Sequence, residues 1–142
     1  GFEGLAERLA GDERWRFDYG DAAHASAGAI AIGARPFLIA YNVELASGDL
    51  ALAKRIARRL RASSGGLRSL KCLALRLAAD RVQVSCNVTD VDGVPLYRVT
   101  ELVRRAAGRD GVSVRRSELI GLAPYRAVDR TARAYAAAEP LR

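Results

Sequence analysis

The segment from Val82 to Thr89 alternates apolar and polar residues at every position, and this alternation constrains the fold more than any other feature. The apolar positions are Val82, Val84, Cys86 and Val88, and the polar ones are Gln83, Ser85, Asn87 and Thr89. Successive side chains of a strand point to opposite faces, so the pattern predicts an antiparallel strand with one face buried. The polar face carries amides and hydroxyls without charge. It is either a wetted sheet face or a surface that holds a polar ligand without the desolvation cost of a charge.

The rest of the chain predicts an alternation of strands and helices. We expect strands at 29–32 and 37–45 as a hairpin, a helix at 49–62 capped by Asp49, strands at 70–77 and 82–89, a helix at 95–107, one bent strand or a short pair within 112–122, and a helix at 125–138. This order is typical of an α+β ferredoxin-like βαββαβ sandwich with its helices on one face, here with an added N-terminal hairpin strand and an added C-terminal helix. Residues 1–27 are expected to be the end of a preceding subdomain's helix plus a connecting loop, and 28–142 the main domain.

Composition limits the class of protein. The chain has 142 residues, half of them apolar, and no apolar run long enough to span a membrane. It contains no methionine and begins with Gly1, so we expect a piece of a longer protein. Cys72 and Cys86 are too few for a disulfide framework or a metal site and are expected to be buried free thiols, which favours the cytoplasm. The net charge of +7 fits either anionic ligands or arginines on solvated helix faces.

Several side chains are candidates for ligand contacts. Asn42 and Asn87 would project onto the same open sheet face if their strands are neighbours, or they would cap the turns that follow. Arg35 lies between a Gly-Ala turn and a proline, and could hold a carboxylate or form a salt bridge within the hairpin. Asp18 lines a cleft or forms an Asx-turn. His24, the only histidine, is a candidate for general acid/base work, for a ligand contact or for a loop residue.

Five segments carry recognisable motifs in a fixed order. They are RFDYG at 16–20, GARPFLIAYN at 33–42, SGGL at 64–67, VQVSCNVTD at 82–90 and SELIGLAP at 117–124. Together they resemble the glutamate formiminotransferase family, and specifically its C-terminal subdomain. The resemblance covers residues 16–124.

This resemblance implies a function for the whole protein. Enzymes of the family transfer a formimino group from N-formimino-L-glutamate to the co-substrate tetrahydrofolate in histidine breakdown, with the folate between the sheets of two subdomains. The matching positions imply folate or substrate contacts at Arg16, Phe17, Asp18, Gly20, Arg35, Asn42, Gln83 and Asn87, and no catalytic residue in this chain. The catalytic half would be an N-terminal subdomain, without which we expect no activity.

Two other classes of function are compatible with the predicted ferredoxin-like fold. A stand-alone ferredoxin-like module, binding a small molecule or acting as a dimeric regulator through its open sheet, would self-associate and need no second half. RNA binding is disfavoured, because Gln83, Ser85 and Asn87 stand where the common RNA-recognition module has stacking aromatics.

Overall fold

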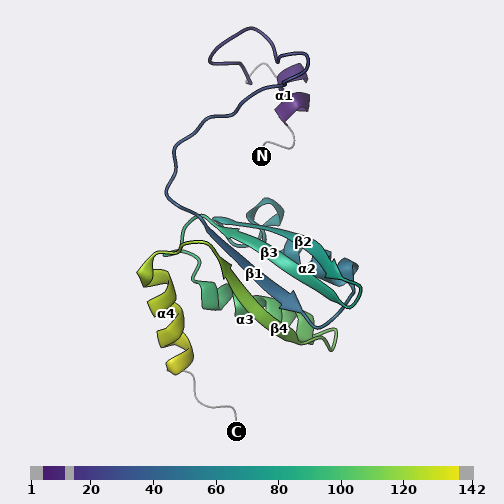
Figure 1. Ribbon diagram of the computed structural model, residues 1–142, viewed down its shortest axis with the longest axis vertical. Helices are drawn as coiled ribbons and strands as arrows, with labels where there is room; N and C mark the ends of the chain where they lie inside the picture. The colour runs from purple at the N-terminus through teal and green to yellow at the C-terminus, as the bar shows by residue number, and fades with distance from the viewer. Residues whose placement is uncertain (1–4, 12–14, 138–142) are drawn as a thin grey trace. The chain divides into compact units, whose positions relative to one another are not determined.

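Four strands form one antiparallel sheet in the order β2-β3-β1-β4 (Figure 1). The computed structural model describes residues 5–11 and 15–137. The strands are β1 (Ile39–Leu45), β2 (Leu70–Ala78), β3 (Arg81–Val88) and β4 (Val114–Ile120). Helix α2 (Leu50–Leu60) joins β1 to β2, α3 (Leu96–Gly108) joins β3 to β4, and α4 (Tyr125–Ala136) follows β4. The predicted ferredoxin-like βαββαβ order is confirmed.

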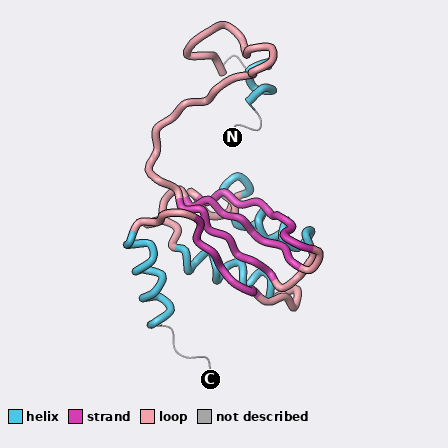
Figure 2. The backbone as a smooth tube through the Cα atoms, in the orientation of Figure 1, coloured by secondary structure: helices cyan, strands magenta, loops and turns pink. Residues whose placement is uncertain are grey.

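The helices of this sheet's own unit cover one of its faces, as predicted, and no helix of residues 36–137 lies on the other face. Figure 2 shows α2 and α3 as one layer behind the strands. The core lies between these layers and combines alternate strand residues with one stripe of each helix, namely Ile39, Val43, Leu45, Val82, Val84 and Val88 with Leu52, Ile56, Val99 and Val103. Each of these side chains contributes about 1.5–3 kcal/mol by leaving water, so the alternation at β3 determines which face is buried.

Local signals set the ends of α2. The Asp49 carboxylate accepts a hydrogen bond from the Leu52 amide at 3.0 Å, which confirms Asp49 as the N-cap. The helix ends at Leu60, before a short 3₁₀ turn, η2 (Ala62–Ser64). Gly66 then passes so close to the Leu60 carbonyl that a Cβ atom would overlap it. The Gly65-Gly66 pair therefore allows the chain to turn tightly into β2.

The chain divides into two units, residues 1–35 and 36–142. The first contains α1 (Leu5–Gly11), and the Arg8 guanidinium lies 4.8 Å from the centre of the Trp15 ring. A helix was predicted over 2–10, of which residues 2–4 lie outside the described part, as does residue 138 of the last helix. The proposed boundary after residue 27 stays a prediction.

The predicted hairpin strand at 29–32 is wrong. Within the described residues, 29–38 form no strand, and Ile30 and Ile32 are 86% and 94% exposed. The reason is topological: β1 is a central strand whose two edges already pair with β3 and β4, so no edge remains for a preceding strand. Residues 114–120 form one strand with a bulge, which decides between the two possibilities left open for 112–122.

Candidate functional site

The open sheet face consists of rows of side chains that run across the strands. From β2 to β4, the first row is Lys71, Asn87, Ala40 and Ile120, the second is Leu73, Ser85, Asn42 and Glu118, and the third is Leu75, Gln83, Glu44 and Arg116. The two central strands thus carry amides and a hydroxyl over most of this face. The β2 edge is mainly apolar, and the β4 edge carries charges.

Asn42 and Asn87 project onto the same face from neighbouring strands, as predicted. Asn42 pairs with Ser85, and Asn87 pairs with Ala40, so the two amides are diagonal neighbours. Diagonal positions of an antiparallel pair lie about 7–8 Å apart. Asn87 is exposed, while Asn42 and Ser85 are partly buried. These three groups offer donors and acceptors that one flat polar molecule can contact together.

Gln83 lies on the same face but is nearly covered. It is 8% exposed, between Leu75 on one side and Glu44 on the other. All fully buried side-chain nitrogen and oxygen atoms of the described residues have hydrogen-bond partners. Gln83 therefore offers less surface to a ligand than Asn87 does, and its role in ligand binding stays a prediction.

Glu44 is a buried carboxylate surrounded by three arginines. Only 3% of the residue is exposed. The Nε atom of Arg116 donates to one carboxylate oxygen at 2.8 Å, while Arg81 approaches the other oxygen at 3.4 Å and Arg115 at 3.6 Å. The cluster lies at the end of the open face, in the row of Gln83. We call these four residues the Glu44 cluster.

A β-bulge explains how two consecutive arginines reach one carboxylate. Arg116 pairs with Glu44 and Val114 pairs with Leu45, so β4 has one residue more than β1 at this point. In a regular strand, Arg115 would point to the face opposite Arg116, whereas a bulge re-aims the extra side chain. Arg81 completes the cluster from the first position of β3.

The arginines keep Glu44 ionised. Burial alone would raise the pKa of the Glu44 carboxyl, but the hydrogen bond from Arg116 and the charges of Arg116, Arg81 and Arg115 outweigh it, so that its pKa lies below the ordinary value. Our sequence reasoning missed this residue. Extending the period of two from Asn42 would have placed Glu44 on the open face, but its partners are distant in sequence.

The candidate residues of the first unit lie in loops. Phe17 is partly buried, Asp18 and Gly20 are exposed, and Gly20 has a φ of 80°, which favours glycine. The His24 ring nitrogen Nδ1 accepts a hydrogen bond from the Ala27 amide at 3.1 Å, so this side chain caps its own turn. Arg16 and Arg35 are exposed. The part that these residues take in a common site with the open sheet face stays a prediction.

The two cysteines are buried free thiols, as predicted. They face each other across β2 and β3, with 3.1 Å between the sulfur atoms. The hydrogen bond with Cys72 and burial raise the pKa of the Cys86 thiol. No group of three acidic, histidine or cysteine side chains within the described residues could hold a metal ion. Nor does that part of the chain contain a helix with the length and apolarity needed to cross a membrane.

Residues 40–141 match the family described as the formiminotransferase domain. The chain belongs to this family. It is 43% identical over 135 residues to a glutamate formimidoyltransferase of Thermoplasma acidophilum and 40% identical over 136 residues to one of Streptococcus pyogenes serotype M1, and both matches cover 94% of the chain. It is also 35% identical over 148 residues to the formimidoyltransferase-cyclodeaminase of Rattus norvegicus.

The chain spans less than half the length of these relatives. It corresponds to 44% and 45% of the two glutamate formimidoyltransferases and to 27% of the rat protein. The formiminotransferase match begins at the second residue of β1. It includes the three remaining strands, β2, β3 and β4, and the helices α2, α3 and α4. The family resemblance drawn from the motifs is therefore confirmed, and the matches to the relatives extend beyond the ferredoxin-like unit into the first unit.

Proposed function

We propose that this chain is the folate-side subdomain of a glutamate formiminotransferase, which moves a formimino group from N-formimino-L-glutamate to tetrahydrofolate. In this proposal the open sheet face is one wall of the substrate site, and a second subdomain supplies the acid and base groups. The chain alone is then inactive. Two observations support the proposal: the chain belongs to the formiminotransferase domain family, and amide and hydroxyl groups occupy the centre of the open sheet face.

The chemistry of the face fits tetrahydrofolate as a co-substrate. A pterin ring presents several hydrogen-bond donors and acceptors along flat edges. Asn42, Ser85 and Asn87 offer matching neutral groups from adjacent strands. Neutral groups suit this task because they lose less hydration free energy than charges do when a ligand covers them. The positive net charge of the chain would attract both substrates, which carry carboxylates.

The edge of the face fits an N-terminal subdomain as the partner. Leu73, Leu75 and Leu77 on β2 are 52%, 45% and 44% exposed. An exposed apolar row beside a polar region is typical of a surface that another protein surface covers. A homodimer would cover the same row and is the competing arrangement. The two free thiols fit a reducing compartment, and we place the protein in the cytoplasm.

Folate binding by amide-deletion variants tests the proposal. The chain is fused to the N-terminal portion of the Thermoplasma acidophilum relative, and binding of a stable reduced folate is measured by calorimetry. Asn87→Ala and Asn42→Ala each remove one or two neutral hydrogen bonds, so we expect about fivefold weaker binding for each. Ser63→Ala, an exposed polar change outside the sheet, serves as the control and should leave affinity unchanged.

Two results would contradict the proposal. Folate affinity that neither asparagine variant alters would remove the open face from the site. Formimino transfer by the 142-residue chain without a second subdomain would show that the acid and base groups lie here. Self-association of the isolated chain that persists in the fusion would favour the dimeric module instead, and analytical ultracentrifugation measures it.

A further inference from the structure

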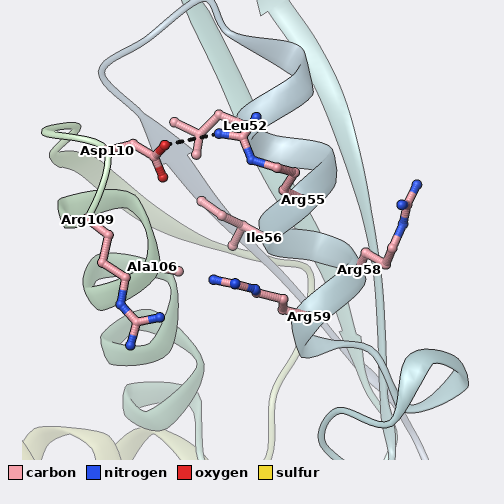
Figure 3. Close-up of a pocket in the computed structure, with 8 residues that line it drawn as sticks. All are labelled: Leu52, Arg55, Ile56, Arg58, Arg59, Ala106, Arg109 and Asp110. Carbon is pink, nitrogen blue, oxygen red and sulfur yellow. Dashed lines mark hydrogen bonds and ion pairs between the residues drawn. The ribbon is translucent and has the colours of Figure 1, made fainter.

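A groove lined by arginines lies between α2 and α3, in the helix layer and therefore away from the open sheet face (Figure 3). Its volume is about 470 Å³. The apolar lining consists of Leu52, Ile56 and Ala106, and the polar lining of Arg55, Arg58, Arg59, Arg109 and Asp110. This volume falls in the usual range for small-molecule sites, which combine an apolar lining with a few polar groups.

Most of the positive charge in the groove is uncompensated. Arg55 forms an ion pair with Asp110 at 3.1 Å. The side chains of Arg58, Arg59 and Arg109 form no hydrogen bond or ion pair with another described residue. Because the Arg58 side chain is directed away from the groove, Arg55, Arg59 and Arg109 against Asp110 leave a surplus of two positive charges in it. Figure 3 shows Arg59 extending from α2 across the groove towards Ala106 on α3, while Arg58 points away from it.

This arrangement differs from arginines spread over a solvated helix face. Arg55 and Arg59 are four residues apart on α2, and like charges at that spacing destabilise a helix by about 0.2–0.5 kcal/mol. The helix dipole favours Arg59, which lies in the last turn, but not Arg55, which lies mid-helix. A concave surface lined by one sign of charge concentrates counter-ions. An anion in the groove would remove the repulsion.

We propose that the groove between α2 and α3 binds a small organic phosphate with one phosphoryl group, such as a nucleoside monophosphate. Guanidinium groups bind phosphate oxygens through paired hydrogen bonds. One phosphate carries about 1.5–2 negative charges at neutral pH, so a single phosphoryl group balances the surplus. The organic part of the ligand then covers Leu52, Ile56 and Ala106. This site is independent of the formiminotransferase function, since it shares no residue with the open face.

Titration of the 142-residue chain at constant ionic strength tests the proposal. Inorganic phosphate and AMP are the probes, citrate is the carboxylate comparison, and binding is followed through the arginine Nε–Hε signals in NMR. We expect saturable binding of both phosphates, and about tenfold weaker binding in Arg59→Gln and in Arg109→Gln, because each loses a charged hydrogen bond. Arg133→Gln on α4 makes the same change in net charge away from the groove and should change affinity less than about twofold.

The folding of each variant is checked by its thermal unfolding midpoint, which should not change, because Arg59, Arg109 and Arg133 are exposed. Absence of saturable phosphate binding, or equal weakening in Arg133→Gln, would overturn the site. Citrate binding as tightly as inorganic phosphate would overturn the assignment to phosphates. Binding of an RNA oligonucleotide but not of AMP would replace the small-molecule ligand by nucleic acid. None of these outcomes affects the folate test on Asn87.

Discussion

Replacing Glu44 by glutamine should destabilise the fold by about 2 kcal/mol at neutral pH. The amide keeps one oxygen that can accept from Arg116, but its NH₂ group faces the donors of Arg81 and Arg115. Hydrogen bonds to charged groups contribute about 1.5–3 kcal/mol each. Breaking a fully buried pair costs about 3–5 kcal/mol. The loss here is smaller because the side chains of Arg81, Arg115 and Arg116 are 35%, 54% and 59% exposed and can return to water.

The destabilisation caused by Glu44→Gln should be smaller at acid pH than at neutral pH. The pKa of Glu44 is lowered in the folded protein, whereas in the unfolded chain a glutamate titrates near about 4.3. The unfolded state therefore binds more protons than the folded state at acid pH, and the contribution of Glu44 is lost as the pH falls through its folded pKa. The stability difference between wild type and Glu44→Gln should stay constant from about pH 7 to pH 5 and shrink below about pH 4.3.

Urea unfolding of the wild type and the variant between pH 3 and pH 7 measures this difference. The slope of the free energy of unfolding against urea concentration is compared between the two proteins to detect changes in the unfolded state. Glu118→Gln is the matched control. It makes the same chemical change on the same face, but Glu118 is exposed and forms no ion pair with another described residue. We expect Glu118→Gln to lower the free energy of unfolding by less than about 0.5 kcal/mol. Equal effects of the two variants at pH 7, or a Glu44→Gln effect that does not shrink in acid, would refute the reasoning.

Three further predictions concern the core. Tyr41→Phe removes a buried 2.6 Å hydrogen bond to Thr100 and should lower the free energy of unfolding by about 1 kcal/mol in the same assay. Gly48→Ala places a Cβ atom against the Ala79 carbonyl group of the β2–β3 turn and should lower the free energy of unfolding by at least about 2 kcal/mol. Gly108→Ala is the control: its Cβ atom meets open space, and the change should be neutral or raise the free energy of unfolding by about 0.5 kcal/mol. The thiol of Cys86 has a raised pKa and is buried, so a disulfide reagent should label it at the rate of unfolding; rapid labelling of the native protein would contradict this.

The parts of the fold that follow from local pattern could be predicted from the sequence. Strict alternation identified β3, and a capping aspartate with an apolar stripe identified α2. The predicted hairpin strand at 29–32 does not form, although Ile30 and Ile32 have the two-residue spacing of a strand. Strand formation depends on an available partner edge, and both edges of β1 are occupied by strands much later in the chain. Local periodicity carries no information about that competition.

The Glu44 cluster could not be predicted because it depends on register. Arg81 is 37 residues from Glu44 and Arg116 is 72 residues away. Their approach requires the antiparallel pairing of β1 with two strands and one bulge in β4. Asn42 and Asn87 needed only the strand order, because period two already assigned both to the open face. Motifs therefore located the neutral centre of the face, while its charged end depends on the three-dimensional pairing. For the same reason, Glu44→Gln tests the strand register directly, since a one-residue slip would turn Glu44 into the core and abolish the predicted contrast with Glu118→Gln.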